Sequence, residues 1–418
     1  MNIIYCIDEF PPVFWGGLGT YARETTKRLL QYRIHPAVLS RNSGTLPVSD
    51  LQNGIPVYRP DIIRADDTIP YLIPCDVKNW GVPDQRFFSD IMQYNQLGAY
   101  HFVRTLHQAK NRQFKLIVAH DWISATAGLI IRENLNIPFI FHIHSHEEGR
   151  MESPSKIVCD IERKAAEKGD VIITVSYAMK KALVNLGYQE EKIQVVYNGV
   201  DPDVFNPDSI TGDQIAEFRN AIGVSDNPMI LYVGRLTRIK GVDELIKAMP
   251  RVVEKISGIR LVILGVGELE TELRKMTEQL GLTETIILKC EHVPEQELIM
   301  YYAACDCAVF PSKYEAFGIV CTEAMAMAKP VIAGVFGTGG MFEQVVAEGD
   351  EQTGFHVNPY SPEDIAEHIC ILLNNPEMCA EFGRAGRKRV IELFTWDKAA
   401  EKTAEIYRQV IVPRKDEA

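Results

Sequence analysis

The chain lacks the long apolar segments and the positive charge that define several classes of protein. No apolar run approaches the roughly 18 residues of a membrane-spanning helix. The first seven residues lack the basic lead and cleavage site of a secretory signal, and we expect a buried strand there. Lys and Arg number 44 against 56 Asp and Glu, a net charge of −12, which disfavours nucleic-acid and anionic-membrane partners.

Paired cysteines are also missing. The nine cysteines are scattered from Cys6 to Cys379 and include no CxxC pair. A disulfide framework or a zinc site would show paired spacings, so we expect buried free thiols in a reducing compartment, the cytoplasm. There is no low-complexity tract and no repeat of 20–50 residues.

Short β-branched runs alternate with amphipathic helical stretches along the 418 residues. Most runs are continuously apolar, which is typical of parallel strands covered by helices on both faces. We predict strands over residues 3–7, 115–119, 138–144, 171–175 and 194–197, then over 229–233, 260–264, 285–288, 307–310 and 330–333. The predicted fold class is α/β with doubly wound parallel sheets.

Turn residues at 198–202 divide the two series of strands. We therefore predict one domain over residues 1–200, a second over 205–395, and a C-terminal helix over 396–418. Whether this helix crosses back to the first domain stays open. Residues 42–100 have weak periodicity, and we expect an irregular insertion there.

A glycine pair, Gly16-Gly17, precedes a helix predicted over residues 21–30. Free N–H groups and the helix dipole at such a position favour a phosphate. Residues 17–22 formally match the G-x-G-x-x-A dinucleotide fingerprint, but eight residues with two prolines separate the preceding strand from Gly16. We therefore favour a loop that covers a ligand, and an ordinary βα loop remains an alternative.

Two cations follow the strand at 229–233. Ligands of open α/β sheets bind beyond the carboxyl ends of the strands, where Arg235 and Lys240 are expected. A guanidinium and an ammonium together suit a diphosphate. The alternative is a solvated basic turn. A second glycine turn, at residues 265–267, is explained more simply by strand–helix packing.

Two glutamates follow the strand at 307–310. Glu315 is expected in the loop, and Glu323 in the second turn of a helix that begins near Gly318. The helix start between them offers free amides. Together these groups can accept sugar hydroxyls, bind a phosphate and hold a ribose, although two surface charges remain possible.

In order along the chain, the glycine pair, residues 198–201, the Arg235/Lys240 pair and Glu315-x7-Glu323 resemble retaining GT-B glycosyltransferases of family 4 and the related glycogen synthases. The resemblance covers essentially the whole chain. It implies two Rossmann-like domains facing a cleft, with the nucleotide-sugar donor on the second domain and the acceptor on the first. By position it assigns donor binding to Gly16, Gly17, Arg235, Lys240, Val293, Phe317, Gly318, Ile319, Val320 and Glu323.

The same resemblance implies three catalytic residues. Glu315 would contact the transferred sugar, and residues 141–145 resemble the segment whose histidine, here His144, lies beside that sugar. Residues 119–122 resemble a His-Asp-Trp segment of glycogen synthases and point to Asp121. The family needs no cofactor and no metal. Strand alternation nevertheless places His142, His144 and His146 on one face, so a metal cluster remains an alternative.

The resemblance implies transfer of a hexosyl group, preferably glucosyl, from a nucleotide-diphosphate sugar to a hydroxyl acceptor. Residues 144–150 resemble archaeal-type glycogen synthases, and residues 337–340 resemble the Thr-Gly-Gly segment of the synthases. These likenesses favour a glucosyl donor and an α-glucan acceptor. The missing lysine before Gly16-Gly17 departs from the bacterial synthases. Alternatives are a family-4 enzyme with a lipid, small-molecule or cell-envelope acceptor, a nicotinamide-dependent oxidoreductase, and a catalytically silent sugar-binding protein.

Overall fold

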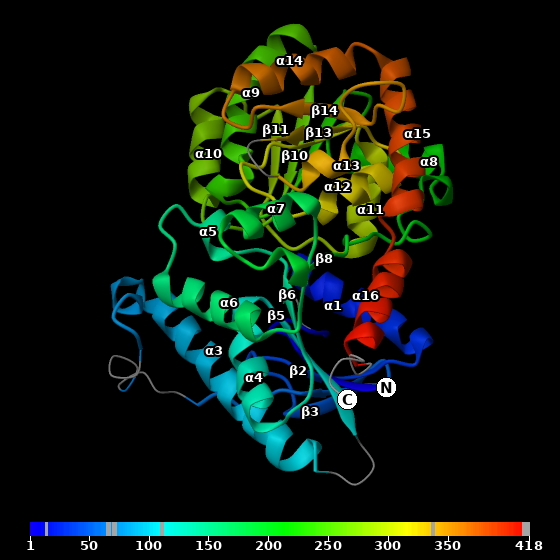
Figure 1. Cartoon of the computed structure of the whole chain (residues 1–418). Helices are drawn as coiled ribbons and strands as arrows, with labels where there is room; N and C mark the ends of the chain where they lie inside the picture. The colour runs from blue at the N-terminus through cyan, green and yellow to red at the C-terminus, as the bar shows by residue number, and fades with distance from the viewer. Residues whose placement is uncertain (13–15, 64–67, 69–72, 109–112, 336–338, 412–418) are drawn as a thin grey trace. The chain divides into compact units, whose positions relative to one another are not determined.

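The computed structural model describes residues 1–12, 16–63, 68, 73–108, 113–335 and 339–411. The chain divides into two compact units, each with its own sheet (Figure 1). Unit 1 comprises Met1–Val175, Lys180–Tyr197 and the chain from Trp396 onward. Unit 2 comprises Ser176–Met179 and Asn198–Thr395.

Unit 1 has, within the described residues, an eight-stranded sheet in the order β3-β4-β2-β1-β5-β6-β7-β8. The strands are β1 Asn2–Cys6, β2 His35–Leu39, β3 Ser49–Gln52, β4 Ile55–Tyr58, β5 Phe114–His120, β6 Phe139–Ile143, β7 Val171–Thr174 and β8 Ile193–Val195. The helices are α1 Gly17–Leu29, α3 Val82–His101, α4 Asp121–Asn134, α5 Glu147–Arg150, α6 Lys156–Lys168, α7 Tyr177–Asn185 (which begins in unit 2) and α16 Trp396–Ile411. Neighbouring strands are parallel except for the β3–β4 pair.

Helices cover both faces of this sheet. Helices α3, α4 and α6 pack side by side, and α1 packs with the C-terminal helix α16 on the other side (Figure 1). Within unit 1, Arg28 of α1 donates to Asp397 at 2.7 Å, and the ring of Trp396 meets the edge of Tyr21 with centroids 6.1 Å apart. The apolar positions of α16 are therefore buried against α1 and the sheet.

Unit 2 has a six-stranded, all-parallel sheet in the order β11-β10-β9-β12-β13-β14 among the residues that are described. Its strands are β9 Met229–Val233, β10 Arg260–Leu264, β11 Ile286–Lys289, β12 Cys307–Phe310, β13 Val331–Gly334 and β14 Gly354–Val357. Its helices are α8 Gly212–Ala221, α9 Val242–Lys255, α10 Glu270–Gln279, α11 Glu295–Ala304, α12 Ile319–Ala326, α13 Met341–Gln344, α14 Pro362–Leu373 and α15 Pro376–Leu393. Helix α9 packs on α14, and α12 packs on α15.

The doubly wound α/β fold class is confirmed. All ten predicted strands are present, with ends within two residues of the predicted ones. Their β-branched side chains are buried between helices, and full burial of each such side chain contributes about 1.5–3 kcal/mol. Continuous apolar runs therefore identified these strands correctly.

The expectation of an irregular insertion over residues 42–100 is wrong for nearly half of that segment. It contains β3, β4 and the 20-residue helix α3. Strand β2 was also missed, because Pro36 interrupts its pattern. Pro36 is tolerated because β4 pairs only with Val38 and Leu39, so the missing N–H of the proline lies outside that ladder.

Each sheet has a point where the strand order reverses. In unit 2 the chain proceeds from β9 to β10 and β11 on one side, then to β12, β13 and β14 on the other. In unit 1 the corresponding neighbours are β1 and β5. Ligands of open α/β sheets bind beyond the carboxyl ends of such strands.

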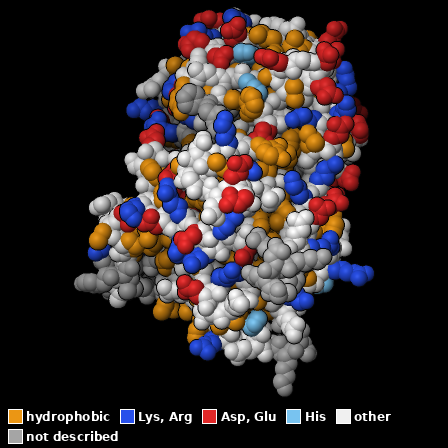
Figure 2. All heavy atoms as spheres, in the orientation of Figure 1, with side chains coloured by type: hydrophobic (Ala, Val, Ile, Leu, Met, Phe, Trp, Pro, Cys, Tyr) orange, Lys and Arg blue, Asp and Glu red, His pale blue; other side chains and the backbone are white. Residues whose placement is uncertain are grey.

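None of the helices in the described ranges is both long enough and apolar enough to cross a bilayer. On the face drawn in Figure 2, basic and acidic side chains are interspersed. On this face, therefore, neither sign of charge predominates.

Candidate active site

The loops after β9 and β12 lie in contact at the switch point of unit 2. The backbone N–H of Lys313 donates to the carbonyl of Ile239 at 2.8 Å. A Cβ on Gly241, whose φ is +67°, would lie 2.0 Å from the carbonyl oxygen of Pro311. Only glycine allows this approach, so the sequence places the two loops backbone against backbone.

These loops bring together Lys240 and Glu315. The Lys240 ammonium pairs with the Glu315 carboxylate, and the two side chains are only 16% and 17% exposed. An ion pair at this depth is less screened by solvent than a surface pair. Lys240 is predicted to bind a diphosphate and Glu315 to bind a sugar. These two residues lie 75 positions apart in the sequence, and their side chains are in direct contact.

Glycines also allow close backbone contacts between the neighbouring loops. A Cβ on Gly265, after β10, would lie 1.9 Å from the carbonyl oxygen of Gly234. A Cβ on Gly340 would lie 2.2 Å from that of Ala316. The second glycine turn therefore packs against the loop after β9, and not strand against helix as the sequence suggested.

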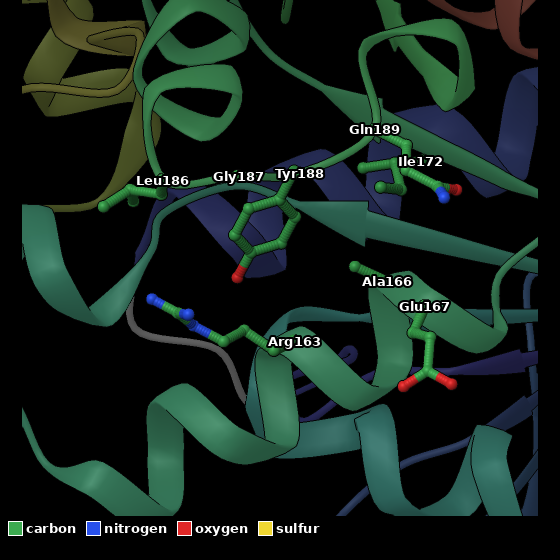
Figure 3. A pocket seen from close by; sticks show the side chains of 8 residues that line it. All are labelled: Arg163, Ala166, Glu167, Ile172, Leu186, Gly187, Tyr188 and Gln189. Carbon is green, nitrogen blue, oxygen red and sulfur yellow. The ribbon is translucent and has the colours of Figure 1, made fainter.

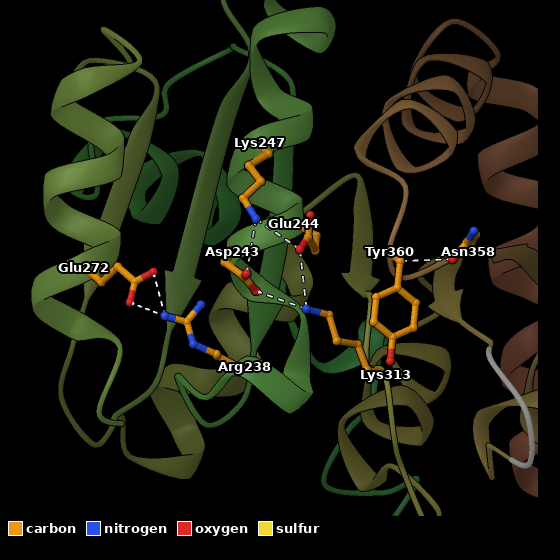
Figure 4. Close-up of polar contacts among 8 residues, drawn as sticks. All are labelled: Arg238, Asp243, Glu244, Lys247, Glu272, Lys313, Asn358 and Tyr360. Atoms are coloured by element: carbon orange, nitrogen blue, oxygen red, sulfur yellow. Dashed lines mark hydrogen bonds and ion pairs between the residues drawn. The ribbon is translucent and has the colours of Figure 1, made fainter. Parts of the chain in front are cut away.

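Lys313 anchors the loop that carries Glu315 to the start of α9 (Figure 4). Its ammonium lies 3.4 Å from Glu244 Oε1, 3.9 Å from Asp243 Oδ1, and 5.2 Å from the ring centroid of Tyr360. Sequence analysis missed this residue, because its partners lie about 70 residues earlier and 47 later in the chain.

Arg235 lies in the same loop as Lys240, but its side chain is exposed. Its carbonyl accepts a hydrogen bond from Tyr232 Oη at 3.0 Å. Burial, and secondarily the charge of Glu315, raises the pKa of Tyr232, so this hydroxyl remains a donor. The backbone around Arg235 is thereby fixed while its guanidinium stays available to an anion.

Glu323 lies in the second turn of α12, where the sequence placed it. Its Oε2 accepts from Tyr302 Oη at 3.0 Å, and the same hydroxyl donates to the Val320 carbonyl at 3.3 Å. Gly318 caps the helix with φ +101°, and the first amides, from Ile319 onward, have no intrahelical acceptor. The expected arrangement of carboxylate and free amides is therefore present on one helix.

The remaining donor-site candidates of unit 2 differ in placement. Val293 is half-buried in the loop between β11 and α11, at the same end of the sheet. The Phe317 side chain is 2% exposed and packs edge-on against Phe394, with ring centroids 5.9 Å apart. Phe317 can therefore offer a ligand only its backbone.

In unit 1, Gly16 and Gly17 form the start of α1. The helix begins at Gly17, four residues earlier than predicted, with Gly16 as its N-cap in extended conformation. The preceding residues 13–15 lie outside the described part of the chain. The first amides of α1 are the free donors expected at this position.

Three buried or half-buried imidazoles cluster in unit 1: His120, His142 and His144, with ligand atoms within 4.8 Å of one another. His120 Nδ1 lies 3.0 Å from His144 Nε2. The expectation that strand alternation places His146 on one face with His142 and His144 is wrong. Strand β6 ends at Ile143, so alternation stops there, and His146 Nδ1 instead caps α5 by accepting from the Gly149 N–H at 3.0 Å.

Two tyrosines that sequence analysis missed complete this cluster. His142 Nε2 lies 3.0 Å from Tyr407 Oη, and its Nδ1 lies 3.3 Å from Tyr21 Oη. Hydrogen bonds among the described residues thus involve four of the six ring nitrogens. Burial lowers the pKa of all three histidines, and their mutual repulsion adds to this for His120 and His142, so the cluster is neutral at pH 7. A metal ion would have to displace these hydrogen bonds.

Asp121 holds the segment that carries His144. Asp121 as a residue is 6% exposed, and its Oδ1 accepts from the backbone N–H of His144 at 2.7 Å and of Ser145 at 3.4 Å. Asp121 has φ +52°, a conformation uncommon outside glycine. These contacts give the carboxylate a positioning role for residue 144.

A buried carboxylate beside this segment leads to a prediction about stability. Glu162 of α6 accepts from the backbone N–H of Glu147 at 3.2 Å, and burial raises its pKa from 4.5 to about 8. Stability from this group is complete below pH 4.5 and is lost as the pH rises towards 8, by at most about 5 kcal/mol. We expect Glu162→Gln to remove this decline, as measured by denaturant unfolding at pH 5 and pH 8.

The matched control is Glu167→Gln, an exposed carboxylate on the same helix. Its unfolding free energy should follow the wild-type pH dependence. Identical pH dependence of Glu162→Gln and wild type would contradict the prediction.

A surface cavity of about 280 Å³ lies in unit 1 near α6 and the turn after α7 (Figure 3). Its lining residues are Arg163, Ala166, Glu167, Ile172, Leu186, Gly187, Tyr188 and Gln189. The charged members are already paired, Arg163 with Glu148 at 2.9 Å and Glu167 with Lys164 at 3.1 Å. None of the predicted site residues lines it, so we do not place the reaction there.

Comparison with known proteins gives the family. The family model described as Glycosyltransferase Family 4 matches residues 15–204, and the model described as Glycosyl transferases group 1 matches residues 214–389. The chain is 30% identical over 414 residues to an uncharacterized glycosyltransferase of Methanocaldococcus jannaschii, with 98% of each chain covered. It is 28% identical over 422 residues to glycogen synthase of Mycobacterium tuberculosis, covering 97% of this chain and 94% of the relative.

The fold is similar to that of solved GT-B structures. Sucrose-phosphate synthase of Thermosynechococcus elongatus matches with a TM-score of 0.78 at 22% identity, over 98% of each chain. At this identity the likeness shows the fold, while the curated relatives show the family. The chain therefore belongs to the group 1, family 4 glycosyltransferases, and is a retaining, nucleotide-sugar-dependent hexosyltransferase with the GT-B fold.

Proposed function

We propose that this enzyme transfers a glucosyl group from a nucleotide-diphosphate glucose to a hydroxyl of an α-glucan. The observation that carries the donor site is the pairing of Lys240 with Glu315 at the switch point of unit 2. A cation suited to a diphosphate and a carboxylate suited to sugar hydroxyls are adjacent, as the junction of diphosphate and sugar requires.

In the proposed mechanism, the bond between the anomeric carbon and the diphosphate oxygen breaks as the acceptor oxygen bonds to the same face of that carbon. Lys240, Arg235 and the first amides of α12 stabilise the charge that develops on the departing diphosphate. The leaving phosphate takes the proton of the acceptor hydroxyl. The configuration is retained without a protein nucleophile, because attack and departure share one face.

The other residues have supporting roles in this proposal. Glu315 accepts hydroxyls of the transferred glucose, and Glu323 accepts those of the ribose. Gly16 and Gly17 donate amides to the donor phosphates. His144 adjoins the reacting sugar, held by the Asp121 contact to its backbone N–H.

The glucan acceptor rests on two supports: the similarity of residues 144–150 to the archaeal-type synthases, and the similarity of the chain to a glycogen synthase over most of its length. Residues 337 and 338, which also favoured glucose, lie outside the described residues. Small-molecule and lipid acceptors are the competing class.

A donor and acceptor screen tests the proposal. The protein is incubated with UDP-, ADP- and GDP-glucose and with the corresponding galactose and mannose donors, each with and without glycogen, and release of nucleoside diphosphate is measured. We expect release from a glucose donor to depend on glycogen, with lengthening of its chains. Transfer to glucose 1-phosphate or to a lipid extract but not to glycogen would overturn the glucan assignment.

A further inference from the structure

His120 lies directly beside the proposed catalytic histidine. It is fully buried, and its Nδ1 is 3.0 Å from Nε2 of His144. Its other ring nitrogen, Nε2, is buried and has no hydrogen-bond partner among the residues the structure describes. This asymmetry distinguishes the two ways in which the pair can share its protons.

In the first arrangement His120 Nδ1–H donates to His144 Nε2, and the partnerless nitrogen of His120 is a bare acceptor. In the second, His144 Nε2–H donates to His120, and the partnerless nitrogen carries a buried proton without an acceptor. Unpaired buried N–H donors are rarer in folded proteins than under-used acceptors. The first arrangement is therefore favoured, and it requires the proton of neutral His144 to be on Nδ1.

We propose that His120 is a positioning residue that fixes His144 as the Nδ1–H tautomer, so that His144 presents a hydrogen-bond donor to a hydroxyl oxygen of the transferred hexose. The inference rests on the proposed function, in which His144 adjoins that sugar. Within the described residues, Nδ1 of half-buried His144 makes no hydrogen bond to protein, so it is available to substrate.

The same arrangement determines what His144 does not do. The lone pair of its Nε2 is used by His120, and its Nδ1 carries a proton. His144 therefore has no free lone pair with which to remove the acceptor proton. This is consistent with transfer of that proton to the leaving phosphate.

The surroundings keep His144 neutral and its ring in place. Burial lowers its pKa, and the nearby Asp121 carboxylate opposes this only in part. The ring of Tyr21 meets it edge-on at 4.4 Å between centroids, and His142 is stacked at 5.9 Å. With the backbone held by Asp121, rotation of the ring is restricted, so the tautomer sets the polarity presented to the sugar.

The test measures the tautomer directly. The full-length protein is labelled with ¹⁵N-histidine, and the His144 ring signals are assigned by their loss in His144→Asn. We expect a protonated Nδ1 and an unprotonated Nε2 in wild type. His120→Asn, whose amide N–H can replace Nδ1–H, should retain this pattern. His120→Leu, which has no donor, should populate the Nε2–H form.

Kinetics give a second readout. Loss of one neutral hydrogen bond is worth roughly a tenfold change, so we expect kcat/KM for the donor to fall about tenfold in His120→Leu. His120→Asn should recover most of this loss, and nucleoside diphosphate affinity should not change in either variant. His35→Leu, at an exposed histidine, is the matched control.

A proton on Nε2 of His144 in the wild-type spectrum would overturn the inference, and this measurement needs no variant to fold. Full activity with an unchanged His144 spectrum in His120→Leu would also overturn it. Because the tautomer is read without turnover, its failure is distinguishable from failure of the proposed glucosyl transfer, which the donor screen decides.

Discussion

Glu315→Gln is expected to lower kcat by on the order of 10²- to 10³-fold while nucleoside diphosphate binding is retained. The carboxylate is proposed to accept hydroxyls of the transferred sugar, and an amide replaces one acceptor by a donor. In the structure Glu315 also pairs with Lys240, so its neutralisation leaves that ammonium free for phosphate. We therefore expect the Kd of nucleoside diphosphate to stay the same or to decrease.

Calorimetric titration of nucleoside diphosphate and a coupled assay of its release measure the two effects separately. Glu270→Gln is the matched control, because Glu270 is an exposed carboxylate of unit 2 that forms an ion pair with Arg274. Parallel losses of binding and turnover in Glu315→Gln would contradict the role assigned to this residue.

Combined replacement of Arg235 and Lys240 by alanine is expected to weaken diphosphate binding and to slow transfer. Hydrogen bonds to charged groups contribute about 1.5–3 kcal/mol each, so loss of both is expected to lower kcat/KM by on the order of 10²- to 10⁴-fold. Both kcat and the Kd of nucleoside diphosphate should change, because the two cations contact the phosphates in the ground state and meet more charge as the bond breaks.

The control removes two positive charges from the same unit without touching the proposed site. Arg238, which precedes α9, pairs with Glu272 of α10, and Lys247 pairs with Glu244 within α9 (Figure 4). The Arg238→Ala/Lys247→Ala variant should keep near wild-type turnover. Unchanged turnover in Arg235→Ala/Lys240→Ala would contradict the prediction. Equal losses of turnover in both double variants would show that the loss does not come from contacts of Arg235 and Lys240 with the diphosphate.

Much of the proposed donor site was predictable because it depends on short segments. Strands β9 and β12 are apolar runs, and the residues after them leave the sheet at its carboxyl edge, so their polar side chains were expected to be functional. The position of Glu323 in the second turn of α12 was predictable from its spacing after Gly318, where the helix was expected to begin. Phe317 shows the limit of this reasoning, because its packing on Phe394 involves a residue 77 positions away.

The histidine cluster shows a different limit. Alternation along a strand predicted over 138–144 grouped His142 with His144, which the structure does bring together, but it also included His146, which lies beyond the end of β6. The true third member, His120, comes from the neighbouring strand β5, and strand adjacency is not written in either segment. The signal available in the sequence was that His120 belongs to residues 119–122, which resemble the His-Asp-Trp segment of glycogen synthases.

The sequence by itself determined the α/β class, ten strands, and the identity of the cations and carboxylates that follow them, because hydrophobic periodicity and chain order are local properties. Only the tertiary structure decided that β9 adjoins β12, that Lys240 meets Glu315, and that Tyr407 of the last helix bonds to His142. These contacts join residues 75 to 265 positions apart, and they form only when the core of each unit packs.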